Sequence, residues 1–287
     1  MPEDKKNKIQ GMLTSAAGIQ EPEERSRKYR NIVGILSFEA MRSNDPWYLE
    51  EAIKTAGLVT HDSSKAYVEI IRAMAKIGAN RKDEMILRDA LKVAERIDND
   101  LDLSVALHEI VVVFAKYGVD RKDEEIFSFS SELIKRIPLN TYRSLAFRNI
   151  SRALVGRDPK KALELLETSI GLIEKSKDTE PVYLISAFCD IAVLLAKFSD
   201  ERSYGFIKKA IALADDIADE FEKSSVLLKI VETETAIGTE KHDEGLLKEA
   251  AVISEGITRE YYKTLALKAM SQKPVISKII TDADFAD

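Results

Sequence analysis

The stretch from Lys65 to Ile97, KAYVEIIRAMAKIGANRKDEMILRDALKVAERI, decides the fold because the chain repeats its pattern 40 positions later. Arg81-Lys82-Asp83-Glu84 returns as Arg121-Lys122-Asp123-Glu124, and Gly78 returns as Gly118. A fixed period of this size is typical of stacked helical hairpins, in which each hairpin buries its apolar face only against its neighbours. The sequence therefore predicts an all-α repeat array.

Each repeat contains two predicted helices, which we name helix A and helix B. Helix A covers about residues 65–77, and we expect Gly78 to end it in the left-handed conformation that glycine tolerates. Helix B begins near Asp83, whose carboxylate suits a helix N-terminus. Its apolar residues recur at the spacing of one buried helical face: Ile86, Leu87, Ala90, Leu91, Val93, Ala94 and Ile97.

Two recurring positions, one in each helix, give the number of helices. We name them anchors because they are expected to be buried, and small residues dominate the helix B set. The helix A anchors are Ile32, Ile70, Ile110, Ile150, Ile191, Ile230 and Met270. The helix B anchors are Met12, Ala52, Ala90, Ser130, Ser169, Ala210 and Ala250. These anchors predict fourteen helices, read as seven hairpins in which a helix B precedes a helix A.

Proline placement supports this division. Six prolines fall between the predicted helices or at a helix start, where a missing amide hydrogen does least harm: Pro22, Pro46, Pro138, Pro159, Pro181 and Pro274. We therefore predict one right-handed α-α superhelix over residues 1–272. The remaining residues, 273–287, are expected to form a capping helix or an acidic tail.

Composition limits the cellular setting. The chain has 287 residues, 45% of them hydrophobic, and no apolar run of the ~20 residues that a membrane helix needs. One cysteine, Cys189, excludes an internal disulfide framework, so we expect a cytoplasmic protein without membrane contact. The net charge of −6 makes nucleic acid an unlikely partner. Abundant Lys and Glu with only three glutamines hints at a thermophilic source.

The chain resembles tetratricopeptide-like repeat proteins. In the better copies a glycine of helix A precedes a small residue of helix B by twelve positions, and Asp190–Lys197 looks like the helix A of such arrays. The glycine and small-residue pairs are Gly78 with Ala90, Gly118 with Ser130, and Gly238 with Ala250. The resemblance covers about residues 8–272. The period of about 40 departs from the family's 34, and HEAT-type arrays stay an alternative.

In tetratricopeptide arrays, helix A lines a concave groove, so the resemblance implies a ligand surface here. The positions two before, two after and six after each helix A anchor would face this groove. Eight cations and His108 occupy these positions against one acid, Glu232. The cations are Arg30, Arg72, Lys76, Lys116, Arg148, Arg152, Lys197 and Lys268.

Arg148 and Arg152 lie four positions apart with no acid nearby in their own helix. Their repulsion calls for compensation from outside that helix. Either Glu109 or Asp190 on an adjacent helix A supplies it, or an anionic ligand does. The pairs Arg30-Asn31 and Arg148-Asn149 also resemble those with which some tetratricopeptide domains clamp a terminal carboxylate.

Three functional hypotheses follow. The leading one is a non-catalytic scaffold, without metal or cofactor, whose basic groove binds an acidic peptide or another protein's acidic segment. The second is binding of nucleic acid or a phosphate ligand by the same groove. The third is an all-helical enzyme, because Asp215-Asp216-Ile217-Ala218-Asp219 resembles the aspartate-rich motif of prenyl diphosphate synthases, although a solvated helix end explains it more simply. The acidic C-terminus, Asp282, Asp284 and Asp287, is a candidate for self-association.

Two further residues stand out. Glu234 occupies a position that is apolar in the other repeats, which predicts a carboxylate that is either partly buried with a raised pKa or turned to the edge of the repeat. A locally irregular repeat explains it more simply than a functional acid does. Cys189, two residues before an anchor, is expected to be a buried and inert thiol.

Overall fold

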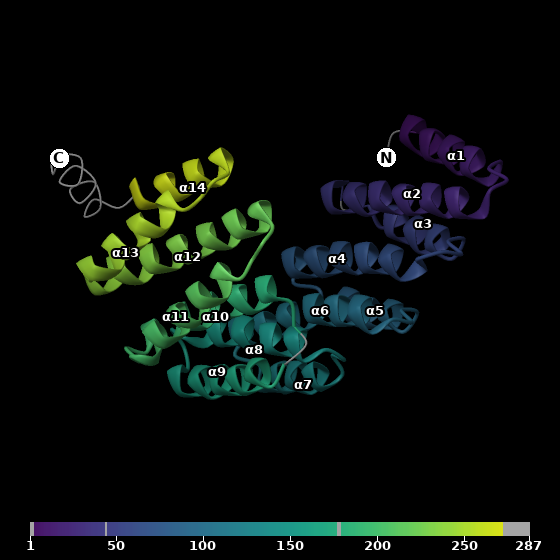
Figure 1. Cartoon of the computed structure of the whole chain (residues 1–287). Helices are drawn as coiled ribbons and strands as arrows, with labels where there is room; N and C mark the ends of the chain where they lie inside the picture. Colours follow the sequence, from purple (N-terminus) through teal and green to yellow (C-terminus); the bar gives the residue numbers. More distant parts are fainter. Residues whose placement is uncertain (1–2, 44, 177–178, 272–287) are drawn as a thin grey trace. The chain divides into compact units, whose positions relative to one another are not determined.

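A computed structural model describes residues 3–43, 45–176 and 179–271. This described part contains fourteen α-helices and no strand (Figure 1), so the all-α prediction and the helix count are confirmed. The helices are α1 (Glu3–Ala17), α2 (Pro22–Ser43), α3 (Pro46–Ala56), α4 (Ser63–Arg81), α5 (Glu84–Ala94), α6 (Asp100–Arg121), α7 (Glu124–Lys135), α8 (Asn140–Leu154), α9 (Pro159–Glu174), α10 (Pro181–Lys197), α11 (Arg202–Asp215), α12 (Glu220–Lys241), α13 (Glu244–Glu255) and α14 (Glu260–Ser271).

The chain divides into two compact units, unit 1 (residues 1–150) and unit 2 (residues 151–287). Even-numbered helices correspond to the predicted A helices and odd-numbered helices to the B helices. In unit 1, α2, α4 and α6 pack on one another in sequence, and each contacts the B helix that follows it. In unit 2, α10, α12 and α14 pack in the same way. One superhelix over residues 1–272 stays a prediction, and the predicted segment 273–287 lies outside the described residues.

In three repeats, a two-residue turn connects an A helix to the B helix after it: α4 to α5, α6 to α7, and α12 to α13. In the turn between α4 and α5, Lys82 adopts a left-handed conformation with φ of 54°, and Asp83 accepts a hydrogen bond from Met85 N at 3.0 Å. The amide of Asp83 donates to the carbonyl of Gly78 at 3.0 Å. The same turn recurs at Lys122-Asp123 and at His242-Asp243. The tight hairpin is therefore an A helix with the B helix that follows it, where the sequence analysis grouped each B helix with the next A helix.

The prediction that Gly78 ends helix A is wrong, because α4 continues through Gly78 to Arg81. Gly78 is needed for close packing instead. A Cβ atom at this position would lie 2.7 Å from Cδ2 of Leu87 in α5, nearer than two carbon atoms approach. Gly118 and Gly238 are equally crowded, against Phe127 and Leu247.

The predicted anchors form the core. Ile110, Ile150 and Ile191 are each at most 1% exposed, which confirms the prediction for the central repeats. All other anchors are buried as well, except that Met12 in α1 is half-buried. Pro46 and Pro159 begin α3 and α9 with aspartate caps at Asp45 and Asp158, in accord with the predicted placement of prolines at helix starts.

A buried serine near the start of several A helices joins consecutive repeats. It lies six positions before the anchor and bonds to the segment that leads into the next A helix, so each loop is tied to the preceding repeat. The oxygen–oxygen pairs are Ser26 with Thr60 at 2.8 Å, Ser64 with Asp98 at 2.6 Å, and Ser224 with Thr258 at 3.3 Å. This serine was not among the predicted residues, although it recurs at a fixed offset from the anchor in the sequence. In the described ranges, no helix combines the length and apolarity needed to cross a bilayer.

Candidate functional site

The A-helix face of unit 1 contains a hollow of about 360 Å³. Its lining residues come from α2, α4 and α6, all of them A helices. Two of the predicted site residues, Arg30 and Arg72, lie on its wall. The polar residues that line the hollow are Arg30, Asn31, Lys65, Glu69, Arg72 and Asp102.

Carboxylates of unit 1 neutralise the cations of this hollow. Asp62 pairs with Arg30 at 2.7 Å and with Lys65 at 3.4 Å. The hydrogen bond from Arg30, followed by the one from Lys65, lowers the pKa of the Asp62 carboxyl below its ordinary value. Arg72 pairs with Glu69 at 2.9 Å and reaches Glu109 at 3.8 Å. The hollow is consequently a mixed-charge surface.

Lys76 and Lys116 differ from these cations. Both are exposed, and neither forms an ion pair with a residue that the structure describes. They occupy the same position, six after the anchor, on the adjacent helices α4 and α6. The corresponding residue of α2 is Phe38, whose side chain is 55% exposed. Phe38, Lys76 and Lys116 thus form a row across three successive A helices, which we call the front row.

Three predicted site residues, His108 of α6 with Arg148 and Asn149 of α8, form a junction in which Arg148 is buried and the other two are half-buried. Arg148 is only 4% exposed, and its Nη1 donates to the hydroxyl of Ser144 at 2.8 Å. Nδ2 of Asn149 lies 3.0 Å from Nε2 of His108. Burial, and secondarily the positive charge of Arg148, lower the pKa of His108 to about 4. His108 is therefore neutral at pH 7 and adds no positive charge to the surface.

The other three predicted groove residues belong to unit 2: Arg152, Lys197 and Lys268, of which Lys268 is exposed on α14. Arg152 is exposed and lies 3.5 Å from Asp190, which also pairs with Lys229 at 3.2 Å. Lys197 pairs with Glu240. Of the two compensating acids considered from the sequence, Asp190 serves Arg152, whereas Glu109 serves Arg72. Carboxylates of the protein itself therefore neutralise Arg152 and Arg72.

Glu234 is fully buried in α12, and no described atom forms a hydrogen bond with either of its carboxylate oxygens. Burial, and to a smaller degree the nearby charge of Glu249, raise the pKa of Glu234 to about 8. The carboxyl is therefore mainly protonated at pH 7. This agrees with the buried-acid alternative, and α12 continues without interruption from Glu220 to Lys241.

The aspartate-rich motif has structural contacts. Asp219 caps α12 by accepting a hydrogen bond from the amide of Glu222 at 2.8 Å, and the carbonyl of Asp215 accepts from Lys223 Nζ. The described residues contain no group of three or more His, Cys, Asp or Glu side chains arranged to hold a metal ion. Cys189 is buried as expected, and burial raises the pKa of its thiol to about 12.

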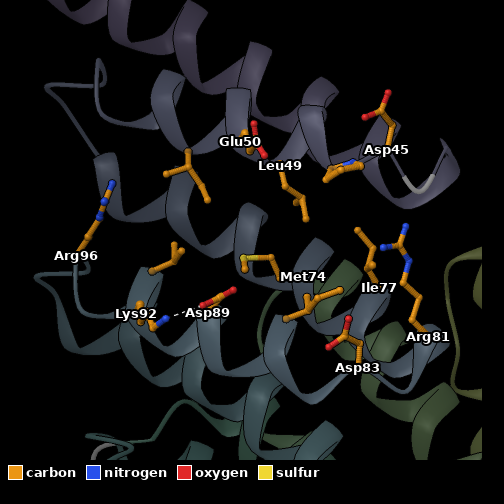
Figure 2. A pocket seen from close by; sticks show the side chains of 14 residues that line it. Asp45, Leu49, Glu50, Met74, Ile77, Arg81, Asp83, Asp89, Lys92 and Arg96 are labelled. Carbon is orange, nitrogen blue, oxygen red and sulfur yellow. Dashed lines mark hydrogen bonds and ion pairs between the residues drawn. The ribbon is translucent and has the colours of Figure 1, made fainter. Parts of the chain in front are cut away.

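A second hollow, of about 470 Å³, lies between the B helices α3 and α5, with α4 as its floor (Figure 2). Arg72 and Met74 are two positions apart, about 200° around a helix. Because Arg72 lines the first hollow and Met74 the second, the two hollows open on different faces of α4. This second hollow was not predicted from the sequence.

No family model matches the chain, and no curated protein matches it. Among solved structures, the chain is similar to the crystal structure of Ton1535 from Thermococcus onnurineus NA1, with 13% sequence identity and a TM-score of 0.27. The match covers 92% of this chain and 96% of that one. A similarity at this TM-score carries no argument about fold or function.

Proposed function

We propose that the protein is a non-catalytic scaffold that binds an acidic segment of another protein on the A-helix face of unit 1. The proposal rests on the front row, in which two exposed lysines have no acidic partner among the residues that the structure describes and stand beside an exposed phenylalanine. An acidic segment would neutralise Lys76 and Lys116, and an apolar residue in it would cover Phe38. The attraction acts over about a Debye length, ~8 Å at physiological salt.

The spacing of the helices specifies the ligand further. Packed helices lie about 8–10 Å apart, and a peptide in the polyproline II conformation has three residues per turn and advances roughly 3.1 Å per residue. A peptide that crosses α2, α4 and α6 therefore places every third side chain over the next helix. The expected ligand carries one apolar residue followed by two acids, each three positions after the previous one.

The paired cations of the neighbouring hollow contribute to the same surface. Exposed ion pairs are worth only about 0–1 kcal/mol, so a ligand carboxylate can replace Glu69 or Glu109 beside Arg72 at little cost. Asn31 lies next to Arg30 on this wall and offers an amide donor for a peptide carbonyl or a terminal carboxylate. These groups would add contacts to a ligand that the front row binds.

The architecture belongs to the same proposal. We infer one continuous right-handed, tetratricopeptide-like superhelix over residues 1–272, supported by the shared turn after α4, α6 and α12 and by the sequential packing of A helices inside each unit. In such an array, the A-helix face of unit 1 would be part of a longer groove.

The test uses a fluorescent peptide with Leu, Glu and Glu at intervals of three residues, titrated with the full chain and followed by anisotropy. The double variant Lys76→Glu with Lys116→Glu should weaken binding at least tenfold. A matched control, Lys54→Glu with Lys135→Glu, changes the net charge equally on α3 and α7, where both lysines are exposed, and should leave binding unchanged.

Equal affinity of the two double variants would refute the proposal, since net charge alone would then explain any loss. Replacing the peptide with single-stranded nucleic acid tests the phosphate alternative. Stronger binding of nucleic acid, with an affinity that falls steeply as salt rises, would favour that alternative over an acidic peptide.

A further inference from the structure

The hollow between α3 and α5 is apolar at its base and charged at its rim. Its base is formed by Leu49, Ile53, Met74, Ile77, Ile86 and Val93. Figure 2 shows Leu49 and Met74 pointing into the space between the helices, with charged side chains around them. A volume of about 470 Å³ lies in the range of ligand-binding pockets in proteins.

The next repeat shows what fills the corresponding space. Met74 and Asp89 of the hollow correspond, 40 positions later, to Phe114 and Phe129. These two rings pack edge to face between α6 and α7, with centroids 5.2 Å apart. The guanidinium of Arg88 in α5 lies 4.9 Å from the centre of the Phe129 ring. An aromatic pair thus joins α5, α6 and α7.

A third pair of equivalent residues increases the difference in side-chain volume between this hollow and the next repeat. Ile77 of the hollow corresponds to Tyr117, which is buried and donates a hydrogen bond from its hydroxyl to the carbonyl of Lys82. Between α3 and α5, the aromatic rings of the next repeat are therefore replaced by smaller side chains. The hollow lacks at least the volume of one ring, at a site where the same scaffold accommodates rings one repeat later.

The rim favours one direction for a helix that enters the hollow. The N-termini of α3 and α5 lie at the same end, with caps Asp45 and Asp83, and Arg81 is beside them (Figure 2). Lys92 and Arg96 lie at the other end. A helix antiparallel to α3 and α5 would bring a basic last turn to the two aspartates. Its acidic first turn would face Lys92 and Arg96, in accord with both helix dipoles.

We propose that the hollow between α3 and α5 is a second interaction site, which binds an amphipathic helix of a partner protein through one aromatic side chain. The aromatic residue fills the space that Phe129 fills in the next repeat. The partner helix carries acids in its first turn and cations in its last turn. This site lies on a different face of α4 from the proposed acidic-segment site and does not depend on it.

Two probes test the site on the full chain. The first is 3-methylindole, the side-chain analogue of tryptophan, followed by the NMR signals of the methyl groups of Leu49, Ile53, Met74 and Ile86. The second is an 18-residue amphipathic peptide with an acidic first turn, a central tryptophan and a basic last turn, followed by anisotropy. Both probes should bind the wild-type chain, and replacing the tryptophan with alanine should weaken peptide binding at least tenfold.

The decisive variant is Asp89→Phe, which copies Phe129 into the hollow. It should weaken binding of both probes at least tenfold and raise the melting temperature, because the added ring fills the space from within. Asp89→Leu fills part of the same space and serves if the phenylalanine variant fails to fold. The control Ser128→Phe adds a ring at an exposed position of α7 and should leave binding of both probes unchanged.

Other outcomes would overturn the proposal in distinct ways. Undiminished binding of both probes by Asp89→Phe would show that the hollow is not the site. Binding of 3-methylindole without binding of the peptide would indicate a small aromatic ligand in place of a partner helix. Dimerisation of the wild-type chain in sedimentation, lost in Asp89→Phe, would identify the occupant as a second copy. Loss of binding in the Lys76 and Lys116 double reversal would assign the peptide to the A-helix face.

Discussion

Phe114 in α6 and Phe129 in α7 pack edge to face, with an angle of 80° between their ring planes. Such a pair is worth about 0.5–1.5 kcal/mol beyond the area that it buries. Phe129 is half-buried, so Phe129→Ala should lower the free energy of unfolding by about 2–3 kcal/mol. Chemical denaturation measures the loss, with exposed Ser128→Ala as the control. A loss no larger than that of the control would mean that the pair contributes nothing to the junction of α5, α6 and α7.

Gly118 and Gly34 should respond in opposite directions to alanine. A Cβ at Gly118 would lie 2.7 Å from the backbone nitrogen of Phe127, which cannot move aside as a side chain can. Gly118→Ala should therefore cost about 1–3 kcal/mol through overpacking. Gly34, inside α2, has no atom within 4 Å of the equivalent Cβ, so Gly34→Ala should gain up to about 1 kcal/mol of helix propensity. Thermal melts of both variants test the contrast, and equal shifts would refute it.

Glu234 should make the protein less stable as the pH rises. Its pKa is about 8 in the folded chain against an ordinary value of 4.5, so the folded state holds a proton that the unfolded state has released between these two values. Stability contributed by this group is complete below pH 4.5 and is lost by about 1.4 kcal/mol per pH unit up to about pH 8.

Glu234→Leu removes this proton and places there the residue that three other repeats carry, at Leu36, Leu154 and Leu195. Denaturation between pH 5 and 8 should show a smaller decline with pH for this variant, together with higher stability at pH 8. Glu234→Gln serves as the control that removes the titration but keeps a buried polar group. Parallel pH profiles for Glu234→Leu and the wild type would contradict the assignment.

The variant Ile150→Ala tests whether the predicted helix A anchor in the middle of the chain belongs to the core. Ile150 is 1% exposed, so Ile150→Ala should cost about 2–5 kcal/mol through lost burial and a residual cavity. A cost below roughly 1 kcal/mol in chemical denaturation would show that the surrounding helices close the space. The anchor would then be less central to the core than its burial implies.

The sequence predicted the features that depend on one helix or one period. Ile110 and Ile191 are buried because a repeating apolar face leaves few choices of register. Gly78 was misinterpreted because a glycine near a helix end suits either a left-handed cap or a close packing contact. Only the position of Leu87 in the structure decides between them.

Features that depend on the rotation of one helix against another were not predicted. The sequence placed Arg148 beside Arg152 on an open face, whereas packing buries Arg148 and leaves Arg152 exposed. Which carboxylate meets which cation depends on side-chain reach across an interface, as for Glu109 and Arg72. The hollow beside Met74 was detectable in principle, since the aligned repeats carry Phe114 at the same position.

The turn that joins A and B helices has an evolutionary consequence. Residues 81–84 and 121–124 have the same four-residue sequence and the same left-handed lysine followed by a capping aspartate. Removal of residues 82–121 would join Arg81 directly to Lys122 and recreate that sequence. Duplication of the same 40 codons would insert one more B helix and one more A helix between two unchanged turns. Deletion or duplication of this gene segment can therefore change the number of repeats and leave the sequence of each turn unchanged.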